Sequence, residues 1–561
     1  NDPKKQNQEN SGGLSMDNSG AENHTTIFTI AESPLDENTI WVGTDDGNIQ
    51  VTTDGGKIWI NTVSNIVGVP ENTWVYHIEA SSHDSKTAYA VFDGHTSGDM
   101  AAYAYKTTDL GKTWKNITPR GLPETIINAI DISPHDKETV YIATTRYKFN
   151  DKSPGLYKST NYGESWKEIT GNIPYGAYTR VVREDEVRKG LLLAGTELGV
   201  YISFNDGKSW ERFNLNMPVL AVTDLMIKHD DLIVATQGRS FWILDDMGLI
   251  RQMDDTKETR LFNPENSTIG NWYSQLNSNY SDGTSTFTGV NPANGVVIYY
   301  NLNEGDHDQK LTVKIYDENN KLIREINNQT NKNFISYNGG PSREPVLTNN
   351  IGLNRFVWNT RHKSLIGVPY AYIEGRFSGH KAIPGKYKIS LEVGEKSYTS
   401  NFEILKNPNF NVSDIDYAEF DKYTSHMEKK FNKMAEYINN NISSINRLTE
   451  VIKNIKDNED VKNNGKSLLS KMDAWDKKMM QRKSLAYDDV ENFPNKFLAD
   501  YLFILDEIKG DIPNVSKGIL KSLKDLDDSW ESLKKEIDQI IDTDLPDLNS
   551  KLWKIGIGAI N

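Results

Sequence analysis

Cysteine is absent from all 561 residues of this chain, which excludes disulfides, thiolate metal sites and cysteine nucleophiles. Long apolar runs are absent too, since no stretch approaches the roughly 18 apolar residues of a membrane-spanning helix. The 10 histidines form no H-E-x-x-H motif or closely spaced pair, and neither a Gly-x-Ser-x-Gly elbow nor a phosphate-binding loop occurs. The sequence therefore predicts no metal site and no cofactor, and it argues against a serine hydrolase or a nucleotide-dependent enzyme.

Basic residues are fewer than acidic residues in this chain. The chain has 63 Lys and Arg against 78 Asp and Glu, a net charge of −15. Because nucleic-acid backbones bind basic surfaces, we expect no nucleic-acid partner. We likewise expect no membrane span.

The most informative pattern present is an eight-residue box that occurs four times, at 52–59, 107–114, 159–166 and 203–210. Each copy has Ser or Thr first, Asp or Asn third, Gly fifth and Trp last. A short polar side chain followed by Gly is typical of a tight turn, and the Trp suits packing between repeated units. Two copies carry Asn, which cannot act as an acid or base. We therefore interpret these residues as structural: Asp54, Asp109, Asn161, Asn205, Trp59, Trp114, Trp166 and Trp210.

Strand-like segments surround each box in a fixed order. Turns at 33–36, 81–84 and 133–136 separate two β-rich segments that precede the box, and a further strand is expected on each side of it. Four strands per repeat of roughly 45 to 55 residues indicate the blade of a β-propeller. The sequence predicts four complete blades and one partial blade without a box over 26–253.

The boxes are identified as the Asp-box, or bacterial neuraminidase repeat. Together with the phrases at 41–47, 178–185 and 238–246, they resemble the C-terminal part of large secreted bacterial proteins of a sortilin-like, or neuraminidase-repeat "glycosyl hydrolase", family. The resemblance implies further blades upstream, so that 1–25 is a lead-in segment and the ring here is partial. It also implies export to the periplasm, the cell surface or the medium. The implied partners are the upstream N-terminal propeller portion or another polypeptide, in a cell-surface complex.

Two further domains are expected downstream, giving a mainly β chain with an α tail. A connector over 254–290 precedes an immunoglobulin-like β-sandwich over 291–408, in which 366–380 is a contact loop or, as we favour, a packed loop. Helical periodicity then predicts an antiparallel four-helix bundle and tail over 412–561.

Two functions remain open. Arg, Tyr and Glu at the ends of blade strands suit a funnel that binds a polar ligand carrying a carboxylate, held by paired hydrogen bonds from Arg. Alternatively, a sialidase- or xyloglucanase-like glycoside hydrolase would need two carboxylates about 5 to 10 Å apart, shared with missing blades. Acids available for it are Asp45, Asp46, Glu79, Glu184, Glu197, Asp245 and Asp246. We favour binding, with candidate residues Tyr178, Arg180, Arg183, Glu184, Glu197, Arg239 and Asp245.

Overall fold

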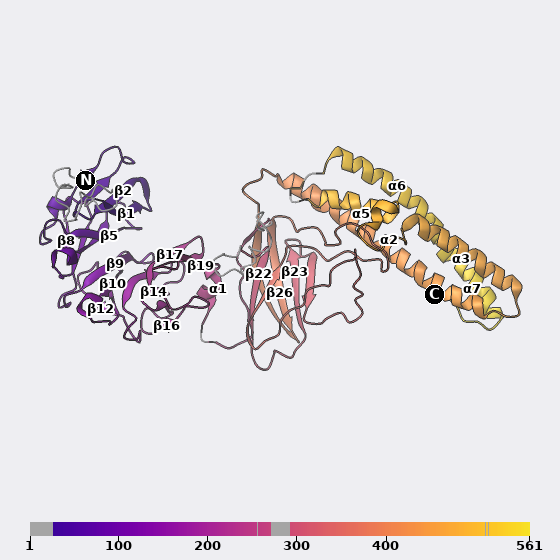
Figure 1. Ribbon diagram of the computed structural model, residues 1–561, viewed down its shortest axis with the longest axis horizontal. Coiled ribbons are helices and arrows are strands. Elements are labelled where there is room, and N and C mark those ends of the chain that lie inside the picture. The colour runs from indigo at the N-terminus through magenta and orange to yellow at the C-terminus, as the bar shows by residue number, and fades with distance from the viewer. Residues whose placement is uncertain (1–25, 255, 271–291, 511, 514, 561) are drawn as a thin grey trace, which may run out of the picture. The chain divides into compact units, whose positions relative to one another are not determined.

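The computed structural model describes residues 26–254, 256–270, 292–510, 512–513 and 515–560 (Figure 1). The chain divides into two compact units, 1–254 and 255–561. The predicted lead-in 1–25 and most of the predicted connector lie outside the described residues. Within the described part, no helix combines the length and apolarity needed to cross a bilayer.

The first unit consists of antiparallel blade-like sheets that follow one another along the chain (Figure 1). Four sheets have four strands, and the fifth has three within the described residues, as the repeat pattern predicts. The strands are β1 (Ile27–Ser33), β2 (Asp36–Thr44), β3 (Ile49–Thr52) and β4 (Ile60–Asn61); β5 (Trp74–Ala80), β6 (Ala88–Asp93), β7 (Tyr103–Thr107) and β8 (Lys115–Asn116); β9 (Ile126–Ile132), β10 (Val140–Thr145), β11 (Gly155–Ser159) and β12 (Lys167–Glu168); β13 (Thr179–Glu184), β14 (Leu192–Thr196), β15 (Gly199–Ser203) and β16 (Glu211–Arg212); and β17 (Val222–Lys228), β18 (Asp231–Thr236) and β19 (Phe241–Leu244). A short helix, α1 (Met247–Gln252), ends the unit.

Each box forms the turn between the third and fourth strands of its blade. The Asp109 Oδ1 atom accepts hydrogen bonds from the Thr107 hydroxyl (2.9 Å) and the Thr113 amide (2.9 Å). The Thr107 hydroxyl oxygen accepts the Gly111 amide at 2.9 Å, and Gly111 has a φ of 77° that favours glycine. Asn205 accepts the Ser209 amide in the same way at 2.9 Å. The box polar residues thus satisfy the amides of a tight turn.

The boxes also join neighbouring blades. The Trp166 indole N–H donates to the Ile117 carbonyl at 2.8 Å, in the blade before its own. A Cβ at Gly163 would lie 2.8 Å from the Ile117 side chain, so this glycine is needed for the close approach. A second link between blades comes from the predicted turns, where the His83 and His135 rings each donate to a carbonyl of the following blade at 2.8 Å.

The first blade has apolar side chains that are exposed among the described residues, on the face that corresponds to interblade contacts in the other blades. Its inner strand β1 contacts β5 of the second blade, and contacts continue in order through β9, β13 and β17. Ile30 on β1 is 63% exposed, whereas Ile78 and Ile130, its equivalents in β5 and β9, are 1% and 0% exposed. Ile27 and Trp59 are also exposed. We call Ile27, Ile30 and Trp59 the open face.

The second unit begins with two sheets around one hydrophobic core. Its main strands lie between 296 and 405, within the region where the sequence predicts a β-sandwich. Residues 256–270, which the sequence assigns to a connector, add two short strands, β20 and β21, to these sheets. One sheet has the order β20 (Arg260–Leu261), β22 (Val296–Leu302), β25 (Gly352–Trp358); the other has β21 (Ser267–Thr268), β27 (Lys396–Leu405), β26 (Gly385–Val393), β23 (Leu311–Asp317), β24 (Leu322–Asn327).

Helices follow the sheets, as the periodicity predicts. The first begins at a capping box in which the Ser413 hydroxyl oxygen accepts the Asp416 amide and Asp416 accepts the Ser413 amide. The helices share one core, which includes Phe431, Trp475 and Tyr501. They are α2 (Asp414–Asn454), α3 (Glu459–Met479), α4 (Asp489–Asn492), α5 (Phe497–Ile508), α6 (Lys517–Gln539) and α7 (Leu545–Lys554), with a π-helical turn between the last two.

The predicted insertion 366–380 is a packed loop. Val368, Ala371, Ile373 and Phe377 are buried in the core that the helices form. The Phe377 ring meets the Phe431 ring of α2 edge to face, with centroids 5.9 Å apart. The loop therefore ties the sheets to the helices within this unit.

Candidate functional site

A β-bulge occurs at the same place in every inner strand of the first unit. The registers of β1, β5, β9, β13 and β17 each skip one residue as the strand pairs with its neighbour. Bulges redirect side chains and are common beside functional sites. Since the inner strands are adjacent, the bulges form a row across the five blades. The skipped residues are Phe28, Tyr76, Asn128, Arg180 and Thr223.

Arg180, at the fourth bulge, is the centre of a polar and aromatic cluster. Its Nη2 atom donates to Glu197 Oε2 at 2.7 Å, and its guanidinium carbon lies 5.5 Å from the centre of the Tyr178 ring. The Tyr178 ring stacks on Tyr147, with centroids 5.2 Å apart. Burial, with the Glu197 charge adding to it, raises the pKa of Tyr178. The buried Arg180 Nε has no hydrogen-bond partner among the described residues.

A second group of charges occupies one equivalent position in three consecutive inner strands: Glu79, Asp131 and Arg183. Arg183 Nη1 lies 3.5 Å from Asp131 Oδ1, and its Nη2 lies 3.0 Å from Asp224 Oδ1 of the fifth blade. Its Nε also donates to the Leu225 carbonyl at 3.0 Å. Arg183 therefore bridges the third, fourth and fifth blades.

The two acids of this group hold protons unusually well. Burial, reinforced by the charge of Asp131, raises the pKa of Glu79 to about 8. Burial raises the pKa of Asp131 to about 6, although Arg183 opposes the shift. Burial and the Arg183 cation lower the pKa of the nearby His77 to about 3, so this histidine is neutral. Both upward pKa shifts favour the protonated form of the carboxyl group.

The structure brings together only part of the predicted site. Tyr178, Arg180 and Glu197 meet, whereas the buried Glu184 points to the other face of β13, where its Oε1 accepts the Gly190 amide at 2.8 Å. Arg239 and Asp245 are exposed residues of the fifth blade, on the β18–β19 connection and directly after β19.

Several neighbouring residues escaped the sequence analysis as members of this site: His77, Asp131, Tyr147 and Asp224. Only the position in the repeat could have indicated them. Asp131, for example, is recognised as the equivalent of Arg183 when the inner strands are aligned at their bulges. Asp46, a hydrolase candidate, is buried in a turn and accepts from the Thr44 hydroxyl at 2.5 Å and from the Asn48 amide group at 2.8 Å.

Comparison with known proteins finds no matching family model and no matching curated protein. Among solved structures, the chain is distantly similar to the GH74 xyloglucanase from Xanthomonas campestris (13% identity, TM-score 0.31, covering 39% of this chain and 36% of that one). It is similarly distant from PorZ, a bacterial surface component of the type-IX secretion system of Porphyromonas gingivalis (14% identity, TM-score 0.33, covering 70% of this chain and 52% of that one). A third distantly similar structure is YCF48 bound to D1 peptide (14% identity, TM-score 0.30, covering 40% of this chain and 64% of that one). The chain thus spans less than two thirds of each.

Proposed function

We propose that residues 26–254 are part of a β-propeller that serves as a binding scaffold and is completed by further blades. The observation that carries this proposal is the contrast between Ile30, which is 63% exposed, and its buried equivalents in the second and third blades. An apolar position that a preceding blade buries in every neighbouring repeat is exposed only where that blade is missing. Exposed apolar sheet surface of this kind is typical of an interface.

The partner that fits the open face is another blade of the same repeat. In such a blade, the backbone carbonyl three residues after the box Trp would accept a hydrogen bond from the Trp59 indole N–H. The Ile117 carbonyl, three residues after Trp114, accepts from the Trp166 indole in this way. Among the described residues, the Trp59 indole N–H donates to the Gly56 carbonyl of its own turn, at 3.0 Å. The blade would come from the upstream N-terminal portion or from another polypeptide, in an exported complex at the cell surface, in the periplasm or outside the cell.

The ligand surface of this scaffold is the bulge row around Arg180. The Arg180 guanidinium is held against the Tyr178 ring and paired with Glu197 by a single short contact. A ligand carboxylate could replace Glu197 there and accept from the Arg180 guanidinium. We therefore propose a peptide, protein or glycan that presents a carboxylate, as in sortilin-like binding.

A glycoside hydrolase is the second candidate, because Glu79 combines a raised pKa with a neighbouring acid, Asp131. A protonated carboxyl beside a second one is what glycosidic bond cleavage requires. Against this, Arg183 contacts Asp131 at 3.5 Å, so this acid is part of a bridge between blades. Hydrolysis of sialosides or xyloglucan oligosaccharides that disappears in Glu79→Gln would favour the enzyme.

Co-expression tests the scaffold proposal. Residues 1–561 alone should be poorly soluble or self-associated, whereas co-expression with the upstream portion should give a stable complex, measured by size-exclusion chromatography with light scattering. Open apolar sheet faces drive association unless they are covered. A monodisperse monomer of 1–561 that melts cooperatively would contradict the proposal.

A further inference from the structure

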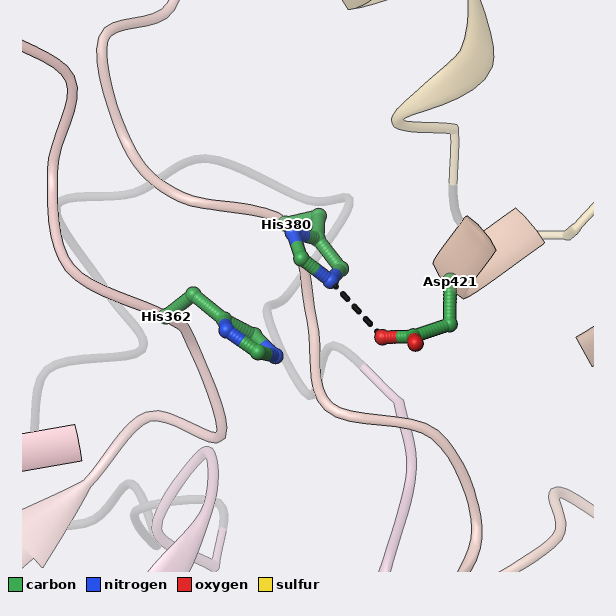
Figure 2. Close-up of side chains that lie close together, drawn as sticks. All are labelled: His362, His380 and Asp421. Atoms are coloured by element: carbon green, nitrogen blue, oxygen red, sulfur yellow. Dashed lines mark hydrogen bonds and ion pairs between the residues drawn. The ribbon is translucent and has the colours of Figure 1, made fainter. Parts of the chain in front are cut away.

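Two histidines of the second unit are brought together by the connection between β25 and β26. The His362 amide donates to the His380 carbonyl at 2.9 Å, and the Ala382 amide donates to the Thr360 carbonyl at 2.6 Å, so the two segments pair along their backbones. The imidazole rings stack with centroids 3.9 Å apart. Asp421 of α2 faces them (Figure 2).

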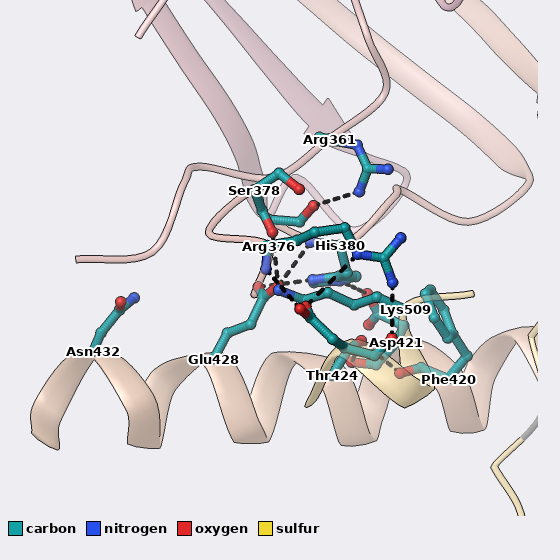
Figure 3. Close-up of polar contacts among 12 residues, drawn as sticks. Arg361, Arg376, Ser378, His380, Phe420, Asp421, Thr424, Glu428, Asn432 and Lys509 are labelled. Carbon is teal, nitrogen blue, oxygen red and sulfur yellow. Dashed lines mark hydrogen bonds and ion pairs between the residues drawn. The ribbon is translucent and has the colours of Figure 1, made fainter. Parts of the chain in front are cut away.

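His380 is held rigidly by the helix. Its backbone amide and its Nδ1–H donate to the two carboxylate oxygens of Glu428, at 2.7 and 2.8 Å (Figure 3). Glu428 is fixed in turn by Lys509, whose Nζ lies 3.3 Å from Glu428 Oε1 and donates to the Ser378 carbonyl at 2.9 Å. His380 and Lys509 are both buried. A carboxylate that binds one ring nitrogen of a histidine fixes the orientation of the other, the arrangement that supports histidine metal ligands.

The opposite nitrogen, His380 Nε2, faces Asp421 Oδ1 at 3.1 Å. His362, His380 and Asp421 each offer one ligand atom, and these three atoms lie within 4.8 Å of one another. We propose that these three residues bind a divalent transition-metal ion, for which Zn²⁺ is the test ion. Two imidazoles and one carboxylate, with water in the fourth position, form a donor set that zinc commonly adopts in proteins.

Binding requires one side chain to turn. The two imidazole planes are only 17° from parallel, and lone pairs in parallel planes do not converge on one point. His362 can supply the movement, because it is half-buried and no hydrogen bond to its ring occurs among the described residues. The ion takes the place of the proton on His380 Nε2, which is released to solvent.

The test uses the full chain after treatment with a chelator and gel filtration. Calorimetric titration with Zn²⁺ should show one specific site per chain, and Co²⁺ should give the visible absorption of a four-coordinate site. His362→Ala should weaken Zn²⁺ binding at least tenfold and remove the Co²⁺ absorption. Asp421→Asn, which keeps the side-chain shape, should do the same if the variant melts like wild type.

His426→Ala is the matched control. This histidine lies on the same helix, half-exposed, with its Nε2 3.5 Å from Asp527. Its loss should leave Zn²⁺ affinity and Co²⁺ absorption unchanged. Failure of the wild-type chain to take up Zn²⁺, or equal affinity in folded His362→Ala, would overturn the proposal and leave the cluster as a buried ionic contact between the loop and α2.

Discussion

The indole N–H of Trp210 donates to the carbonyl oxygen of Ile169 at 2.9 Å, across the boundary between the fourth and third blades. Ile169 stands three residues after Trp166, and Trp166 itself donates to Ile117, three residues after Trp114. One box therefore supplies both the donor for the blade before it and the acceptor for the blade after it. This contact is made by the third and fourth boxes, whereas the buried Trp114 indole N–H of the second box has no hydrogen-bond partner among the described residues.

Replacing Trp210 tests how much this contact between blades stabilises the fold. Trp210 is 2% exposed, so we expect Trp210→Ala to cost about 3–5 kcal/mol of unfolding free energy. Trp210→Phe, which removes mainly the hydrogen bond, should cost about 1 kcal/mol. Trp59→Ala is the matched control, since Trp59 is 38% exposed and its indole donates to Gly56 within its own turn. Denaturant unfolding followed by circular dichroism measures all three, and equal losses at Trp59 and Trp210 would contradict the interblade role.

Replacing the Asp of a box should lower the free energy of unfolding without changing ligand binding. Asp109→Ala deletes the acceptor of the Thr107 hydroxyl and of the Thr113 amide and hydroxyl, so we expect a loss of about 1–2 kcal/mol. Thr108→Ala, an exposed position in the same turn, should change stability by less than about 0.5 kcal/mol. Ligand binding should persist at low temperature. Normal melting with lost binding in Asp109→Ala would mean that the box acid contacts the ligand.

The repeat made most of the first unit predictable. The Gly at a fixed position of each box indicates a tight turn. The spacing between boxes then predicts the strand order and the number of blades. The sequence did not indicate the open face, because Ile30 is the same residue type as the isoleucines of other strands. Its exposure depends on which blade is absent, and that is a property of packing.

The candidate site was only partly predictable for a related reason. Arg180 and Glu197 are 17 residues apart and meet because β13 pairs with β14, which the strand pattern implies. Asp131 and Arg183 are joined across blades, so their pairing depends on how adjacent inner strands align. His362, His380 and Asp421 are scattered along a loop and a helix, with no spacing that indicates a metal site.

The raised pKa of Glu79 predicts a definite pH dependence. Its folded-state value of about 8 lies above the ordinary value of 4.5, so the folded state holds the proton more tightly. The free energy of unfolding should therefore fall as pH rises from about 4.5 to about 8 and then level off. Glu79→Gln should remove this slope and raise Tm at pH 8.5, because glutamine stays neutral where the glutamate would ionise.

A control separates this effect from net charge. Glu37→Gln removes one exposed carboxyl from β2 of the first blade and should leave the slope of the wild-type curve in place. Melting curves of the first unit between pH 5 and 9 are the measurement. A Glu79→Gln curve parallel to that of wild type would show that this carboxyl ionises normally.

A charge on the open face should reduce self-association. Ile30→Glu places a carboxylate in the surface that we propose another blade covers, so it should shift residues 1–561 toward monomer in light scattering and abolish complex formation with the upstream portion. Val67→Glu is the control, because Val67 is 83% exposed but lies in a loop outside the open face. Equal effects of the two substitutions would point to general solubility, not to a specific interface.

The ligand surface makes the final prediction. Arg180→Ala and Arg239→Ala should each weaken ligand binding at least tenfold, about 1.4 kcal/mol, while lowering Tm little. The ligand is the one found with a panel of carboxylate-bearing peptides and glycans. Arg183→Ala should behave oppositely, because it leaves the buried Asp131 without its cationic partner and should cost about 3 kcal/mol of stability. If the Arg180 and Arg239 variants instead melt early and bind normally once folded, these arginines hold blades together and the ligand contacts another part of the scaffold.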